Sequence, residues 1–256
     1  MHQIRSLLNN VDFKVHLFVK DLKTNQYLMT EKIDDVFSSA SIIKVPILLA
    51  VLNYVQEHHL SLNHVVNISP DHKVDFSVLT EQDLTTSTIY ELLYWMITTS
   101  DNSAINVLID FLGFDELNSY FTKIGLTNTR LQRKMMDFNK LNQGYDNVTT
   151  ARDMAHVFTM IYQQQLLSEV YNEIAIDILC KQRDYERLKR YIADVRIAHK
   201  TGSLDTVCHD VGIVYHKMTD YIIGVFTTEL NDLEVAKRFI GRISKVVYDY
   251  VERRGT

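Results

Sequence analysis

Three short motifs in the sequence carry side chains suited to acyl transfer. The first contains Ser41 and Lys44, at the start of an apolar run that continues to Tyr54 with helical character. In a helix these two residues lie one turn apart on one face, and the unpaired N–H groups of the first turn favour a negative oxygen beside Ser41. A hydroxyl, a nearby amine and free backbone donors make an activated nucleophile. The structural alternative is a serine cap followed by a solvated lysine.

The other two motifs lie farther along the chain, at the ends of predicted elements. Ser100-Asp101-Asn102 falls between two helical segments, and Lys200-Thr201-Gly202 ends the first of three predicted C-terminal strands. A Ser-x-x-Lys is expected about once by chance in a chain this long, but a Lys-Thr-Gly in only about one chain in ten. Three such motifs at element ends indicate one shared site. Taken singly, Asp101 could instead cap the following helix, and Thr201-Gly202 could form a strand-end turn.

The elements that would position these motifs are strands at both chain ends with helices between them. Because both ends supply strands, we expect an α+β fold, an antiparallel sheet of about five strands with an inserted all-helical subdomain. The predicted single domain, 1–256, divides into an α/β subdomain at about 1–50 and 185–256 and a helical subdomain at about 51–184. The expected elements are a hairpin at 15–19 and 26–29, helices at 42–54, 89–96, 103–112, 114–124, 150–163, 168–180 and 233–251, strands at 196–200, 211–216 and 221–228, and a long loop at 127–147.

Composition and charge exclude several classes of protein. The 256 residues are 46% hydrophobic, which is ordinary for a globular protein, and the net charge of −5 argues against nucleic acid as a partner. The two cysteines, Cys180 and Cys208, suggest no disulfide framework and favour a reducing compartment. Neither a secretory leader nor an apolar stretch near 18 residues is apparent. We therefore expect a cytoplasmic protein without membrane association, or an extracellular one if a leader was removed.

The histidines give no metal-binding pattern. His58, His59 and His64 have no clustered acidic partner and no metal-binding spacing, so we expect them at the surface and expect neither metal nor cofactor. His199 and His209 flank Lys200 on or near strands, and packing is their expected role.

The order Ser-x-x-Lys, Ser-Asp-Asn, Lys-Thr-Gly resembles that of the class A β-lactamases and penicillin-binding proteins. The resemblance covers nearly the whole chain, with supporting stretches at 127–131, 149–154 and 198–203. It implies that Ser41 is the acylated nucleophile, that Lys44 accepts its proton, and that Ser100 relays a proton to the leaving nitrogen. Lys44 must be neutral for this role, and burial together with the nearby cation Lys200 would lower its pKa.

The substrate-binding roles also follow from the resemblance. Asn102 would position the lysine base and the substrate, and Lys200 and Thr201 would bind a substrate carboxylate. The backbone N–H groups of Ser41 and Ser203 would form the oxyanion hole. An acyl transfer needs each of these parts, a nucleophile, a base, a leaving-group acid and oxyanion donors.

One part of the family pattern is missing. The family's deacylating glutamate follows the arginine of an Arg-Leu pair by five residues, and that count from Arg130 ends on Met135, which cannot accept a proton. Asp137 lies two residues farther on and is expected to face solvent, and the loop's later asparagine is present as Asn139. The strands after Gly202 offer no arginine to assist carboxylate binding. We therefore predict intact acylation and impaired deacylation.

The sequence thus predicts a serine hydrolase that is acylated at Ser41 by a small, carboxylate-bearing amide or ester of the β-lactam kind. Rival hypotheses are a D-alanyl peptidase-like enzyme and a non-turnover ligand-binding or sensing protein that retains the fold. Turnover separates them, because a sensor gives a single stoichiometric burst. The expected partner is a small-molecule substrate, and the sequence leaves both its identity and the oligomeric state open.

Overall fold

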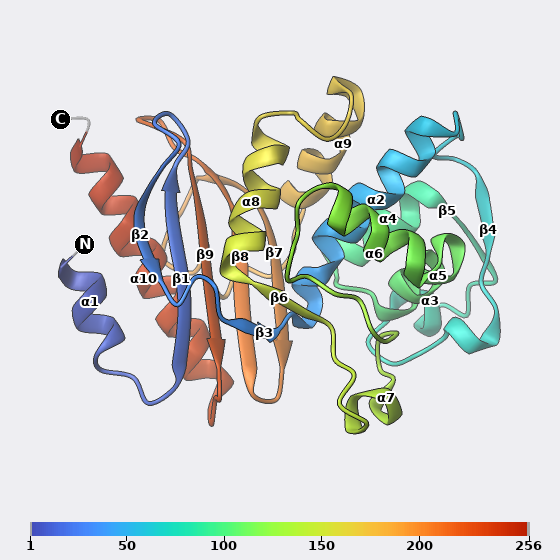
Figure 1. Cartoon of the computed structure of the whole chain (residues 1–256), viewed down its shortest axis with the longest axis horizontal. Helices are drawn as coiled ribbons and strands as arrows, with labels where there is room; N and C mark the ends of the chain where they lie inside the picture. The colour runs from blue at the N-terminus through green and yellow to red at the C-terminus, as the bar shows by residue number, and fades with distance from the viewer. Residues whose placement is uncertain (1, 255–256) are drawn as a thin grey trace.

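The computed structural model describes residues 2–254 and is built on one five-stranded antiparallel sheet (Figure 1). The strand order is β2-β1-β9-β8-β7, so the N-terminal hairpin pairs directly with the last strand of the chain. Both chain ends therefore share the sheet, which confirms the predicted fold class. The strands are β1 Lys14–Asp21, β2 Gln26–Glu31, β7 Arg196–Leu204, β8 Val207–Tyr215 and β9 Tyr221–Thr228.

Helices cover both faces of this sheet. On one face α10 (Leu233–Arg254) and α1 (His2–Leu8) lie side by side, and on the other α8 (Ala151–Tyr162) packs against the central strands (Figure 1). Because both faces are covered, β8 is buried along nearly its whole length, and its sequence is apolar except for His209 and Asp210. The predicted boundary assigned α8 to the helical subdomain, yet it packs on the sheet.

The remaining helices gather around α2 (Lys44–Glu57), whose first nine residues are all buried. The predicted capping box at the start of α4 is confirmed, since Glu91 N donates to Thr88 Oγ1 at 3.2 Å and Thr88 N donates to Glu91 Oε2 at 2.9 Å. These helices are α3 Val78–Glu81, α4 Ile89–Thr98, α5 Asn102–Leu112, α6 Phe114–Lys123 and α9 Glu169–Cys180.

The apolar stretch around α2 is longer than the sequence analysis allowed. By length and composition alone, Ala40–Glu57 could cross a membrane, but 72% of this stretch is buried inside the protein. Burial by neighbouring helices explains the apolar composition, because the central helix of a bundle is hydrophobic on all sides. The segment is thus a core helix of the fold.

Two expected boundaries near the motifs are wrong. The strand expected to end at Lys200 continues to Leu204, so Lys200-Thr201-Gly202 lies within β7, and Gly202 pairs with His209 of β8. Gly202 and Ser203 resemble turn residues, but the hairpin turn falls two residues later. Ser41 lies in a 3-10 turn, η1 (Ala40–Ile43), and α2 itself begins at Lys44.

Short elements were not foreseen, because three to five residues carry little periodicity. The loop expected at 127–147 contains a helix, and its end pairs with the segment that precedes η1. The elements are β3 Val36–Ser38 with β6 Val148–Thr150, β4 Val65–Asn67 with β5 Thr86–Thr88, η2 Pro70–His72 and α7 Phe138–Asn142.

The buried His209 of β8 contacts β3. His209 Nε2 lies 2.8 Å from Ser38 O, and the ring packs against Phe37 and Phe226. Burial lowers the pKa of His209 to about 4. The packing role expected for this residue is consistent with these contacts.

We predict that protonation of His209 contributes to acid unfolding. The unfolded chain takes up this proton near pH 6.5 and the folded protein only near pH 4, so stability falls as pH drops through that window, by about 3 kcal/mol at most. His209→Gln should flatten this part of the pH dependence of the unfolding free energy, measured by urea denaturation. His64→Gln, at an exposed position, is the control. An unchanged slope in His209→Gln would contradict the assignment.

Candidate active site

Ser41 and the β7 motif meet through a close approach of two backbones. A Cβ atom on Gly202 would lie 2.9 Å from Ser41 N and 3.1 Å from Ile42 N. Such contacts are too short for any side chain, so glycine is required where β7 passes η1. The half-buried Ser41 therefore lies directly against the edge strand of the sheet.

Lys44 joins the first motif to the second. Its side chain is fully buried, and Nζ donates to Ser100 O at 2.7 Å, to Ser100 Oγ at 3.1 Å and to Asn102 Oδ1 at 3.0 Å. Ser100 adopts a φ of +59°, a left-handed conformation that is uncommon outside glycine. In this conformation its carbonyl and its hydroxyl both contact the same amine.

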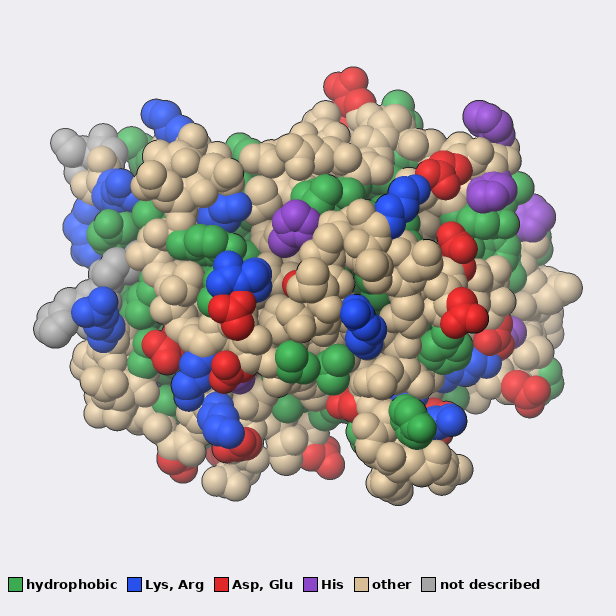
Figure 2. Space-filling view, viewed as in Figure 1, with side chains coloured by type: hydrophobic (Ala, Val, Ile, Leu, Met, Phe, Trp, Pro, Cys, Tyr) green, Lys and Arg blue, Asp and Glu red, His purple; other side chains and the backbone are tan. Residues whose placement is uncertain are grey.

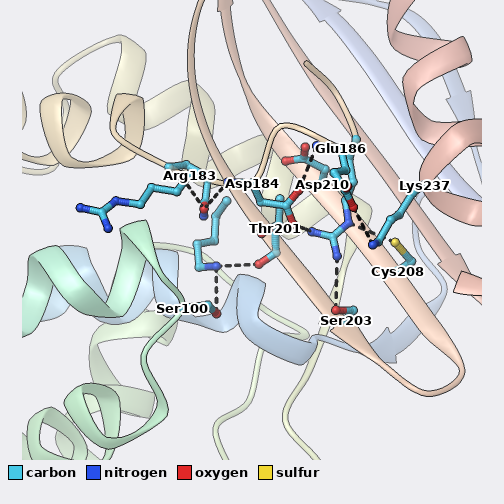
Figure 3. Close-up of polar contacts among 12 residues, drawn as sticks. Ser100, Arg183, Asp184, Glu186, Thr201, Ser203, Cys208, Asp210 and Lys237 are labelled. Carbon is cyan, nitrogen blue, oxygen red and sulfur yellow. Dashed lines mark hydrogen bonds and ion pairs between the residues drawn. The ribbon is translucent and has the colours of Figure 1, made fainter. Parts of the chain in front are cut away.

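Lys200 reaches the same hydroxyl from the sheet. Its Nζ donates to Ser100 Oγ at 3.1 Å and to Thr201 O at 2.7 Å, and the side chain is fully buried (Figure 3). The Ser100 hydroxyl thus lies between two amines, one from α2 and one from the sheet. The three sequence motifs form one cluster.

Burial and mutual repulsion determine the charge of these amines. Burial, followed by the charge of Lys200, lowers the pKa of Lys44 well below its usual value, although Asp101 opposes this. Burial, followed by the nearby Arg187, lowers the pKa of Lys200 to about 7. A neutral Lys44 can accept a proton, whereas Lys200 is poised to change its charge near neutral pH.

Two residues of the second motif hold the loop in place. Asp101 is buried and caps α5 by accepting from Ala104 N at 2.8 Å, which agrees with the capping alternative. Asn102 donates its side-chain amide to Asp75 O at 3.3 Å while its carbonyl oxygen accepts from Lys44. The amide therefore orients the lysine amine from a fixed position.

The end of the β7 motif lies beside Arg187, a cation that the sequence analysis did not identify. Ser203 Oγ accepts from Arg187 Nη2 at 3.3 Å, and the arginine itself is almost completely buried. The strands after Gly202 carry no arginine toward the site, and the arginine beside Ser203 comes instead from the loop before β7. That loop has no periodicity, so no sequence signal indicated where the arginine would lie.

The loop at 127–147 holds Met135 in a fixed and buried position. Met135 N donates to Asn106 Oδ1 at 2.8 Å, and Asn106 Nδ2 donates to Met135 O at 3.3 Å. The side chain is 8% exposed and belongs to the main hydrophobic core. An ion pair between Arg133 and Asp146, with Nη2 and Oδ1 2.9 Å apart, closes the base of the loop.

The acid nearest to Met135 is engaged elsewhere. Asp137 is the N-cap of α7 and accepts from Lys140 N at 2.9 Å, while Asn139 is exposed on that helix. The Asp137 carboxylate is thus engaged by the backbone of α7. This supports the interpretation of Asp137 as an ordinary loop acid.

The histidines show no metal centre within residues 2–254, where no group of three or more His, Cys, Asp or Glu side chains could hold a metal ion. His58, His59 and His64 are exposed. His199 is buried and pairs with Asp210, with Nδ1 and Oδ1 2.9 Å apart.

The sequence and the fold are similar to those of beta-lactamases and of PBP-A. The family model described as beta-lactamase enzyme family matches residues 1–251. The beta-lactamase VEB-1 of Pseudomonas aeruginosa is 26% identical over 232 residues, which are 84% of this chain and 78% of that protein. The structure of PBP-A is similar with a TM-score of 0.90 at 28% identity, covering 98% of this chain and 95% of that one. A leucine-to-glutamate mutant of PBP-A, solved as an acyl-enzyme complex with penicillin G, is equally similar, with a TM-score of 0.90.

We predict that Gly202→Ala impairs the reactivity of Ser41 more than it impairs folding. The new Cβ would displace the backbone of η1 and with it the Ser41 hydroxyl, so labelling of Ser41 by benzylpenicillin should slow by about tenfold or more, since small misplacements have large kinetic costs. Intact mass spectrometry of the labelled protein measures the rate.

Gly113→Ala is the matched control for that experiment. It places a side chain at a φ of +86° with no atoms within 4 Å, at the opposite end of α5 from Asn102. This strain should lower thermal stability by about 1 kcal/mol without slowing the labelling. Equal slowing in both variants would mean that the contact at Gly202 has no special role.

Proposed function

The chain belongs to the beta-lactamase enzyme family, and on this premise we propose that it is a serine hydrolase acylated at Ser41. The observation that carries the proposal is the Ser100 hydroxyl held 3.1 Å from both Lys44 Nζ and Lys200 Nζ, beside η1. This arrangement supplies a proton path between a nucleophile and a leaving group, which an acyl transfer requires.

In the proposed acylation, Ser41 Oγ attacks the carbonyl carbon of an amide or ester, and its proton passes to neutral Lys44. The backbone N–H groups of Ser41 and Ser203 stabilise the oxyanion. When the intermediate collapses, the carbon–nitrogen bond of an amide breaks and the Ser100 hydroxyl gives its proton to the leaving nitrogen. Lys44 then returns a proton to Ser100, with which it is already hydrogen bonded.

The proposed substrate is small and carries a carboxylate. Lys200 and the Thr201 side chain would bind that carboxylate, with Arg187 close enough to assist through Ser203. Figure 2 shows acidic and basic side chains interspersed over the viewed face, which favours a small molecule over nucleic acid as the ligand.

Deacylation is proposed to be slow, because the side chain at the position of the family's glutamate is Met135. Its backbone is held by Asn106 on both sides of the residue, so a shift of the loop that brings another acid into its place would break two hydrogen bonds. This observation also favours the second candidate function, a sensing or ligand-binding protein that is acylated once. A D-alanyl peptidase-like activity requires the same acylation site.

We predict that Lys44→Met slows acylation by benzylpenicillin by about 10²–10⁴-fold, the usual contribution of a positioned proton acceptor. Methionine has a similar volume and no amine, so the fold should persist. The rate is followed by intact mass spectrometry.

Ser41→Ala is the control for the site of acylation, and it should give no adduct at all. If the adduct still forms in Ser41→Ala, another residue is the nucleophile. If Lys44→Met leaves the acylation rate unchanged, another residue is the base.

We further predict that Met135→Glu accelerates hydrolysis of the penicillin adduct without changing the acylation burst. A carboxylate in this place can accept a proton from water, which typically contributes about 10²–10⁴-fold, although a buried site would raise its pKa and reduce the gain. The test compares burst amplitude and the slow steady-state rate in stopped-flow assays. Asp137→Asn controls for a displaced acid: rapid turnover by the unaltered protein that survives this substitution would refute impaired deacylation.

A further inference from the structure

The buried Gln182 links α4 to the loop that leads to β7, two segments beside the candidate active site. Gln182 Nε2 donates to Ile97 O at 2.9 Å, in the last turn of α4, shortly before Ser100. Its Oε1 accepts from Arg183 N at 2.8 Å and from Asp184 N at 3.2 Å, on the loop that leads to β7. All of the amide's hydrogen bonds go to backbone groups of two segments that flank the site. Gln182 therefore fixes the position of Asp184 relative to α4.

Asp184 in turn holds the guanidinium of Arg187. Asp184 Oδ2 accepts from Arg187 Nη1, while Arg187 Nε donates to Cys208 Sγ at 3.2 Å and Nη2 donates to Ser203 Oγ at 3.3 Å (Figure 3). The arginine is thus held along β7 and β8 by three partners on three segments. Only Asp184 among these partners carries a full negative charge to balance it.

The charge of Lys200 depends on this balance. Three charged groups act on Lys200, namely Arg187 and Asp184 of the loop and Asp210 of β8. Other titratable groups on the surrounding elements are Lys44 of α2, whose own pKa Lys200 and Asp101 shift, and His199 of β7, which pairs with Asp210. Arg187 disfavours the charged form of Lys200, whereas Asp184 and Asp210 favour it. Asp210 is already engaged by His199 Nδ1 and by Leu188 N at 3.0 Å. The negative charge of Asp184 therefore offsets the repulsion between Arg187 and Lys200.

We propose that Asp184 and Gln182 are positioning residues, which hold Arg187 beside β7 so that Arg187 and Lys200 can both remain cationic for one substrate carboxylate. The use of the two cations rests on the proposed function, but their mutual placement does not. Without Asp184, the unbalanced guanidinium would push the proton off Lys200 at neutral pH. Without the Gln182 amide, Asp184 would lose its fixed position and Arg187 its partner.

The first experiment titrates the Lys200 amine by NMR in the whole protein, with Lys200→Met used to assign its signal. Lys200 should titrate near pH 7 in the unaltered protein. Asp184→Asn should lower the midpoint by about one pH unit, Gln182→Met should lower it by less, and Arg187→Gln should raise it. Asp177→Asn is the matched control, because it removes the same charge from a surface pair with Lys181 and should leave the midpoint unchanged.

Opposite shifts in Asp184→Asn and Arg187→Gln distinguish positioning from general loosening of the fold, which would move both variants in one direction. Shifts of the same sign, or none in Asp184→Asn, overturn the inference. If the Lys200 midpoint shifts in Asp184→Asn but not in Gln182→Met, Asp184 is a positioning residue and Gln182 is not.

The second experiment measures acylation by benzylpenicillin and by its neutral methyl ester across pH. Acylation by benzylpenicillin should fall as pH rises through about 7, and Asp184→Asn should move this fall to lower pH and slow the reaction at pH 7 by about tenfold. The methyl ester, which has no carboxylate to bind, should be slowed much less than benzylpenicillin by Asp184→Asn. Equal slowing of the two probes would contradict a role in carboxylate binding. If neither probe acylates the unaltered protein while the NMR shifts hold, the proposed function fails and the positioning role stands.

Discussion

Two buried lysines that share one serine hydroxyl constrain the rest of this structure. Removing an ammonium group from water is costly unless hydrogen-bond acceptors replace the water. Lys44 receives three acceptors from Ser100 and Asn102, and Lys200 receives the Ser100 hydroxyl and the Thr201 carbonyl. The repulsion between the amines is relieved by loss of a proton. The same burial that destabilises the charged forms therefore makes one amine a base.

The fold provides those acceptors by bringing a helical loop against a sheet edge. β7 is the outermost strand of the sheet, so one of its edges is open toward η1 and the Ser100 loop. Gly202 lets the two backbones approach within contact distance, and the left-handed backbone of Ser100 directs both its carbonyl and its hydroxyl toward Lys44. Each of these two local features would be unfavourable in isolation. The buried amines supply the interactions that stabilise them.

The parts of this arrangement that could be predicted from sequence are those encoded locally. The strand at Tyr221–Thr228 is a short run rich in β-branched and aromatic residues that follows a turn, and the box at Thr88 and Glu91 is a local capping pattern, so the sequence predicts both correctly. The three motifs were found because each is contiguous. Arg187 and Asn106 were missed because their roles arise from contacts between distant segments. The extension of β7 was missed for a related reason, since Gly202 serves a tertiary contact and not a turn.

The loop around Met135 is held by other contacts than those that hold the buried amines of the proposed acylation site. In the proposed acylation the base is the buried amine of Lys44, which is held by acceptors on Ser100 and Asn102. The loop is held by backbone contacts with Asn106 and by the ion pair of Arg133 with Asp146, none of which involves the side chain at position 135. A buried methionine there contributes apolar contact worth about 1.5–3 kcal/mol, whereas a glutamate would have to ionise in the same dry surroundings. Stability thus favours the residue that lacks the base, and the deacylating function can change while the fold and the acylation site remain intact.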